Sequence, residues 1–77
     1  MTITVKFFAS LRELVGKEDV FLEPSDNLTL EQAWQQATDN TEMPAKLLMA
    51  INLEYAKLDD PVNDNDEVAF FPPVTGG

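Results

Sequence analysis

The sequence predicts one small domain of the α+β class, covering residues 1–77, in which a mixed sheet of about five strands is crossed by one main helix. Residues 2–8 alternate between apolar and polar side chains, which is typical of a half-buried strand. Residues 30–38 repeat apolar side chains at helical spacing. Residues 67–71 alternate again, which predicts a last strand at the other end of the chain.

The first strand presents two different faces. Ile3, Val5 and Phe7 point to one side and are predicted to face the core, while polar residues alternate with them. Phe8 falls on the polar side, where an aromatic ring is unexpected.

The segment between the first strand and the main helix is predicted to hold a short helix over residues 11–15 and a short strand over residues 19–22. Ser10 and Glu13 have capping-box spacing, so Ser10 is the predicted N-cap, and Gly16 ends the helix. The residues expected to face inward are Leu11, Leu14 and Val15 from the helix and Val20 and Leu22 from the strand, with Arg12 and Phe21 on the opposite sides.

The main helix is predicted over residues 30–38. Thr29 and Gln32 have capping-box spacing, and apolar residues then recur at i, i+3, i+4 and i+7. A helix with one apolar face must lie across a sheet, so Leu30 and Trp34 are predicted to anchor the core rather than to bind a ligand.

The second half of the chain is predicted to hold three strands separated by polar loops. The predicted strands cover residues 46–51, 55–56 and 67–71, and the predicted loops and turns cover residues 39–44, 52–54, 59–61 and 63–66. In the last strand, Val68 and Phe70 share one face and Phe71 lies on the other. The acidic turn at 63–66 lacks the glycine and the distal glutamate of a calcium loop, so no metal site is predicted.

Composition restricts the class of function. Five basic and 14 acidic residues give a net charge of −9, which argues against nucleic acid and anionic membranes as partners. The charge suits a partner with a basic surface, but an acidic surface also serves solubility alone. The chain has no Cys and no His, which excludes disulfides, thiolate metal sites and Cys or His nucleophiles. We expect a cytoplasmic protein, because neither a signal peptide nor a membrane span is visible.

The C-terminal tail, residues 72–77, is the most distinctive stretch. Pro72 and Pro73 have no N–H to donate and favour extended geometry, so the tail is predicted to leave the sheet. Gly76 and Gly77 add no side-chain bulk. The pattern indicates a slim C-terminus that enters a narrow site in another protein, and the alternative is a frayed chain end.

Three segments of the chain resemble the small subunits of molybdopterin synthase. They are residues 7–9 (Phe-Phe-Ala), residues 12–14 (Arg-Glu-Leu) and residues 66–77 (Asp-Glu-Val-Ala-Phe-Phe-Pro-Pro-Val-Thr-Gly-Gly). The resemblance spans essentially the whole chain. It implies a ubiquitin-like β-grasp fold, in which the first and last strands lie side by side and parallel.

The resemblance also implies a sulfur carrier. The carboxylate of Gly77 would be adenylated by an activating enzyme that uses ATP, and sulfur from a donor such as a cysteine desulfurase would convert it to a thiocarboxylate. The tail would then enter the large subunit and give its sulfur to cyclic pyranopterin monophosphate, building the dithiolene of molybdopterin. Two small and two large subunits would assemble, and this chain would bind no cofactor and act in catalysis only as part of that complex.

A docking surface is predicted near the root of the tail. Phe8 and Phe71 lie opposite the core faces of their strands, so adjacent first and last strands would present both rings to solvent. The resemblance adds Arg12 and Tyr55 as neighbours. The tail residues Pro72, Pro73, Val74 and Thr75 are expected to contact partners, and Gly76 is expected to give the terminus access to the partner's site.

Two kinds of alternative function remain open from the sequence. A thiamine-type sulfur carrier or a ubiquitin-like protein modifier would share the fold and the Gly-Gly end, and the large subunit that co-purifies would separate these cases. A β-grasp binding module with an inert terminus is the other alternative. Intact mass would identify that module, because its terminus would never exchange an oxygen atom for sulfur.

Overall fold

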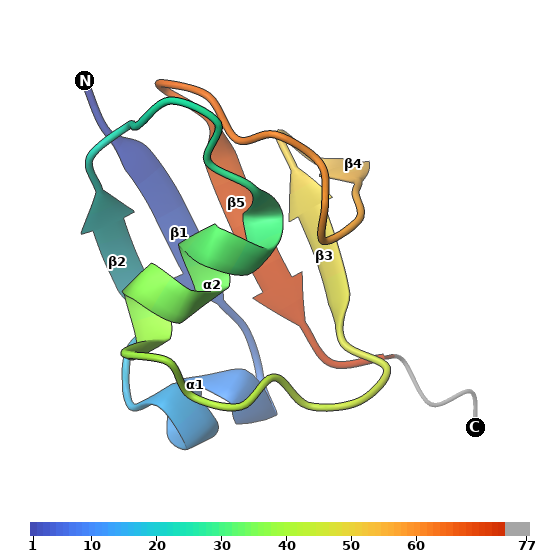
Figure 1. The fold of residues 1–77 in the computed structure, drawn as a ribbon. Coiled ribbons are helices and arrows are strands. Elements are labelled where there is room, and N and C mark those ends of the chain that lie inside the picture. The colour runs from blue at the N-terminus through green and yellow to red at the C-terminus, as the bar shows by residue number, and fades with distance from the viewer. Residues whose placement is uncertain (74–77) are drawn as a thin grey trace.

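The computed structural model describes residues 1–73, in which one helix lies across a five-stranded sheet and a shorter helix lies at one end of it (Figure 1). The elements in chain order are β1 (Ile3–Phe7), α1 (Ser10–Val15), β2 (Asp19–Leu22), α2 (Leu30–Thr38), β3 (Leu48–Ile51), β4 (Glu54–Tyr55) and β5 (Glu67–Phe71). The strand order across the sheet is β2-β1-β5-β3-β4. The predicted class, a mixed sheet with one main helix, is therefore confirmed.

The first and last strands lie side by side in the middle of the sheet (Figure 1). β1 and β5 pair in parallel, with Val5 opposite Val68 and Phe7 opposite Phe70, whereas all other strand pairs are antiparallel. Parallel neighbours need a long crossover, and the chain between β1 and β5 supplies it with α2. This is the β-grasp arrangement, so the adjacency that the resemblance implied is confirmed.

The core lies between α2 and one face of the sheet. Its centre is an aromatic cluster in which Trp34 packs edge-on against Phe7 and Phe70, with ring centroids 5.8 and 5.0 Å apart. The Trp34 indole N–H donates to the carbonyl oxygen of Thr41 at 2.7 Å, so its one polar atom is satisfied. The core prediction for β1, α2 and β5 is confirmed, because these side chains are buried.

Helix α2 begins and ends as the sequence predicts. The Gln32 N–H donates to the Thr29 hydroxyl at 3.2 Å, and the Thr29 N–H donates to the Gln32 side-chain oxygen at 3.0 Å, which completes the capping box. Asp39 ends the helix in the left-handed conformation with φ 55°.

The start of α1 differs from the prediction. Ala9, not Ser10, is the N-cap, and no side chain caps the helix, because the chain turns one residue earlier than the Ser10–Glu13 spacing suggests. Leu14 is 52% exposed rather than buried. In a helix of only six residues, Leu11 and Val15 lie one turn apart on the side that faces the core, and Leu14 lies outside that side.

The second half of the chain differs only at element boundaries. β3 begins at Leu48 instead of Lys46, because Lys46 has φ 63° and cannot continue an extended strand. The β3–β4 hairpin turns on Asn52 and Leu53, and Glu54 already belongs to β4.

Candidate docking surface

Within residues 1–73, no helix covers the face of the sheet opposite α2 (Figure 1). Alternate residues of each strand lie on this uncovered face, since successive side chains of a strand point to opposite sides. In β5, Val68 and Phe70 are buried in the core, while Ala69 and Phe71 are only partly buried on the other side. The uncovered face of the sheet therefore also carries apolar side chains.

These side chains surround a hollow of about 380 Å³, which we call the aromatic hollow. It is lined by Phe8, Ala50, Leu53, Tyr55, Glu67, Ala69 and Phe71. Ala50 and Ala69 lie directly opposite each other on β3 and β5, so two methyl groups form its floor. Larger side chains from four segments form its rim, and Glu67 supplies the one carboxylate. A hollow with an apolar lining and an exposed rim is suited to receive a side chain of another protein.

Phe8 reaches the hollow because the chain turns sharply after β1. Its N–H donates to the Phe70 carbonyl at 3.2 Å, which extends the β1–β5 pairing by one residue, and its own carbonyl accepts from the Leu11 N–H at 3.1 Å. Ala9, inside this turn, has φ 56° and ψ −131°, a conformation that favours glycine. The turn leaves the Phe8 ring 39% exposed.

Arg12 stabilises this turn instead of lining the hollow. Its Nε donates to the carbonyl oxygen of Phe7 at 3.2 Å, which ties α1 back to the end of β1. The side chain is therefore placed to hold Phe8 in position. Its predicted contact with a partner stays a prediction.

Tyr55 and Phe71 pack against each other at the rim of the hollow. Their ring centroids are 6.1 Å apart with an interplanar angle of 47°. Tyr55 is 79% exposed although it packs against Phe71. An aromatic residue that remains this exposed in a small domain is available to a partner.

The structure brings three of the predicted docking residues, Phe8, Tyr55 and Phe71, around one hollow. Phe71 ends β5, and Pro72 and Pro73 follow it outside the sheet, half-buried and exposed respectively. The remaining predicted site residues, Val74, Thr75, Gly76 and Gly77, lie outside the described residues. The roles of all these residues stay predictions.

The sequence prediction missed four residues that line the hollow: Ala50, Leu53, Glu67 and Ala69. The sequence does contain a signal for the two alanines. Each is a small residue within a strand of larger apolar residues, at a position that forms the floor of the hollow. Leu53 carried none, since it lies in a segment predicted as a plain turn.

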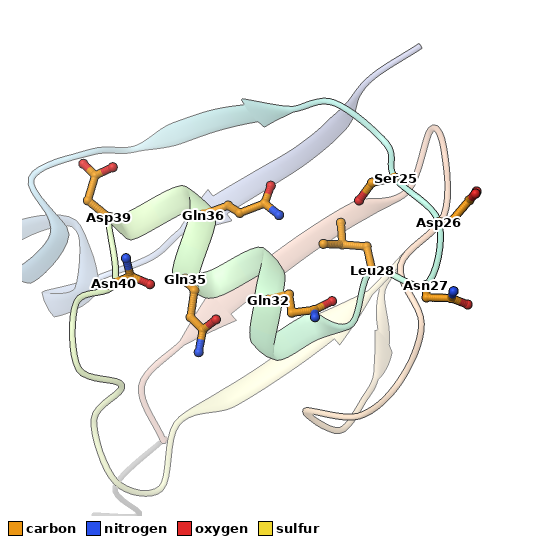
Figure 2. Close-up of a pocket in the computed structure, with 9 residues that line it drawn as sticks. All are labelled: Ser25, Asp26, Asn27, Leu28, Gln32, Gln35, Gln36, Asp39 and Asn40. Carbon is orange, nitrogen blue, oxygen red and sulfur yellow. The ribbon is translucent and has the colours of Figure 1, made fainter.

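A second hollow, of about 560 Å³, lies along the outer side of α2 (Figure 2). Its lining is polar except for Leu28, and no cationic side chain contributes to it. Figure 2 shows Asp26 and Asn27 at one end of α2 and Asp39 and Asn40 at the other, so the polar groups do not converge on one point. This polar hollow offers no defined ligand site.

Within residues 1–73, no group of three or more acidic, His or Cys side chains is placed to bind a metal ion. The described helices are too short to cross a membrane. The aromatic hollow is therefore the feature of the described chain that most clearly indicates a function.

The fold and this surface define a ubiquitin-like β-grasp domain that presents an apolar hollow beside its C-terminal strand. The sequence profile of the ThiS family matches residues 5–77, and the chain belongs to this family. The molybdopterin synthase sulfur carrier subunit of Escherichia coli (strain K12) is 44% identical to it over 81 residues, covering 97% of this chain and 99% of that protein.

Solved structures show the same fold. The crystal structure of SAMP1 from Haloferax volcanii has a TM-score of 0.78 and 28% identity, and each chain is fully covered. A complex of subunits 1 and 2 of the molybdopterin-converting factor from Helicobacter pylori 26695 contains a chain with a TM-score of 0.67 and 25% identity, again with full coverage of both chains.

Proposed function

We propose that this chain is the sulfur carrier subunit of a molybdopterin synthase and that it carries sulfur on the carboxyl group of Gly77. The observation that carries the proposal is the position of the aromatic hollow. Phe71 lines the hollow, ends β5 and is followed directly by Pro72 and the tail. A partner that docks on the hollow therefore lies next to the origin of the tail. The sequence similarity to molybdopterin synthase sulfur carrier subunits, which extends over nearly the full chain, supports the same function.

The proposed chemistry explains why this chain needs no catalytic residues of its own. A C-terminal carboxylate is ionised at neutral pH and is a poor electrophile. Transfer of AMP from ATP to this carboxylate releases pyrophosphate and provides a good leaving group. A sulfide nucleophile then attacks the carbonyl carbon, AMP departs, and a thiocarboxylate remains. Where the nucleophile is a persulfide, an acyl disulfide forms first, and a partner's thiol cleaves its S–S bond, releasing the thiocarboxylate as that thiol is oxidised to a disulfide. The chain has no Cys or His to act as a nucleophile. The proposal assigns the acids, bases and nucleophiles of each step to the partners.

The partners follow from these steps. An ATP-dependent activating enzyme adenylates Gly77, a cysteine desulfurase or a similar protein supplies the sulfur, and the large subunit binds the charged tail. Cyclic pyranopterin monophosphate accepts sulfur in two transfers to form the dithiolene. The pair of subunits in the Helicobacter pylori complex supports a large-subunit partner. We place the assembly, two small and two large subunits, in the cytoplasm.

Changes in tail length test the proposal. Deletion of Gly77 withdraws the carboxylate by about 3.5 Å, and a misplacement of about 1 Å can already lower a rate by roughly two orders of magnitude. Addition of one residue after Gly77 converts its carbonyl into an inert amide. We expect neither variant to form thiocarboxylate or molybdopterin, as measured by intact mass and by product formation.

Folding and binding must be measured beside activity. The described core cluster extends no further along the chain than Phe70, so both variants should melt like the unmodified chain and should still bind the large subunit. A chain with one residue added before Met1 is the matched control, because its length changes but its tail does not. Full sulfur transfer by either length variant would contradict the proposal.

A protein modifier is the second candidate function. It is favoured by the fold shared with SAMP1 from Haloferax volcanii and with the H. volcanii small archaeal modifier protein 1. A modifier would use the same activated terminus, but a lysine amine would attack it and form an isopeptide bond. Covalent conjugates that survive denaturing electrophoresis would indicate a modifier. A non-covalent complex with the large subunit would indicate the sulfur carrier.

A further inference from the structure

We propose that Leu53, at the tip of the β3–β4 hairpin, is an anchor that inserts into an apolar pocket of the large subunit. This inference rests on the proposed function and adds a specificity-determining contact to it. Leu53 lines the aromatic hollow and yet is 91% exposed, more than any of the aromatic rings beside it. An isolated exposed leucine needs no explanation, but this one lies within an apolar surface and has an unfavourable backbone conformation.

The backbone of the hairpin turn does not favour leucine. Asn52 and Leu53 are the two residues between β3 and β4, with φ 52° and φ 70°. Two-residue hairpins with positive φ at both positions prefer Asn-Gly, because glycine has no Cβ to clash in this region. Asn52 fits the preference and Leu53 does not. The fold therefore gains nothing local from this leucine, which points to a role outside the folded chain.

The hairpin tip is also held in place, as an anchor requires. The Asn52 Nδ2 donates to Asp66 Oδ1 at 2.9 Å, and its Oδ1 accepts from the Glu67 N–H at 2.9 Å. The Asn52 N–H donates to the Glu67 carbonyl at 2.8 Å. Three hydrogen bonds thus fix the residue before Leu53 to the start of β5. A side chain carried on a fixed backbone loses less entropy on binding, which favours affinity.

The surroundings of Leu53 indicate the chemistry of the pocket that receives it. Glu54 follows it along the chain, and Asp66 and Glu67 are joined to the hairpin through Asn52. Three carboxylates therefore lie on or beside the hairpin, next to the apolar hollow that Leu53 lines. A complementary pocket is apolar at its centre and carries Lys or Arg at its rim. The large subunit is the proposed occupant because the tip is continuous with the hollow at the origin of the tail.

Substitutions at Leu53 separate binding from folding. Leu53→Gly removes the side chain and suits the turn, and Leu53→Asn keeps a polar side chain that tolerates positive φ. We expect both to raise the Kd for the large subunit about ten-fold, the scale set by losing one buried leucine. Their Tm should stay unchanged or rise by up to about 4 °C. Leu53→Met keeps an apolar side chain and should change the Kd by less than about two-fold.

The measurement is calorimetric titration of the large subunit from the same organism, with thermal melts of each variant. Asn65→Gly is the matched control, because it relieves another positive φ, of 68°, outside the hollow and should leave the Kd unchanged. Unchanged Kd values for Leu53→Gly and Leu53→Asn, with weaker binding by Phe71→Ala, would overturn the anchor and leave the proposed function intact. A lower Tm for Leu53→Gly would show a structural role instead. If the unmodified chain does not bind the large subunit, the proposed function itself fails.

Discussion

The chain has two pairs of adjacent phenylalanines, Phe7–Phe8 and Phe70–Phe71. The first member of each pair lies in the core, and the second lines the hollow on the uncovered face. Phe7 and Phe70 are buried under α2, where their rings stack at 5.9 Å and pack against Trp34. Phe8 and Phe71, each one residue later, line the aromatic hollow on the uncovered face. The same two strands thus supply a buried aromatic cluster on one face and the candidate docking surface on the other.

The comparison shows that position in the strand, not residue type, decides which ring is buried in the core and which lines the hollow. All four residues are phenylalanine, and each has another phenylalanine beside it in the sequence. A shift of one residue along a strand moves a side chain to the opposite face. Large apolar residues on the covered face should therefore govern the free energy of unfolding, and those on the uncovered face should govern affinity.

The largest effect is expected for Phe70→Ala. Removing a fully buried ring that contacts Trp34 and Phe7 should lower the free energy of unfolding by about 3–5 kcal/mol, which is much of the stability of a small domain. Urea denaturation measures the change. A loss below about 1 kcal/mol would mean that the covered face does not carry the stability, and the comparison between the faces would break.

The next effect is expected for Phe71→Ala, the neighbouring residue. It should weaken binding to the large subunit by about 2 kcal/mol and lower the free energy of unfolding by less than about 1 kcal/mol. Titration calorimetry and urea denaturation on the same sample measure both quantities. Global unfolding of Phe71→Ala would show that this ring belongs to the core after all.

The elements that separate the two faces could be read from the sequence because their signals are local. The alternation in β1 and β5 predicted which rings are buried. The capping box and the apolar spacing predicted where α2 begins and which side of it faces the core. The adjacency of β1 and β5 could not be read this way. It depends on a crossover of more than 50 residues, and only the resemblance implied it.

The site was predicted less completely than the fold for two physical reasons. The floor of the hollow depends on the β3–β5 register, which places Ala50 opposite Ala69, and register is a property of two distant segments. Leu53 and Ala9 have positive φ values that neither side chain favours, so propensity argues against the conformations that the tertiary structure imposes. For the same reason the N-cap of α1 was predicted one residue late.

A smaller effect on the covered side is expected for Thr29→Ala. The substitution removes the hydroxyl that accepts from the Gln32 N–H and so opens the capping box of α2. It should lower the free energy of unfolding by about 1 kcal/mol and leave the Kd for the large subunit unchanged. Thr29→Ser, which keeps the hydroxyl, is the control. A change in Kd would show that α2 also affects docking and that the two faces are not independent.

The smallest effect tests whether charge, rather than aromatic packing, contributes to the stability of the covered side. The ion pair between Lys17 and Asp39 is long, at 3.5 Å, and its side chains are 41% and 86% exposed, so it should contribute less than about 0.5 kcal/mol. Asp39 is the C-cap of α2, where a negative charge opposes the helix dipole by about 0.3–1 kcal/mol. Its φ of 55° is tolerated by Asn as well as by Asp.

Asp39→Asn should therefore raise the free energy of unfolding by about 0.5 kcal/mol although it breaks the ion pair. Lys17→Met is the matched control. It removes the same pair and also the hydrogen bond from Lys17 Nζ to the Ala37 carbonyl at 3.3 Å, so it should lower the free energy of unfolding by about 0.5 kcal/mol. If Asp39→Asn raises the free energy of unfolding and Lys17→Met lowers it, the interaction of each charge with the helix terminus, not the ion pair, determines the change in stability. Equal losses from both would mean that the ion pair itself stabilises α2.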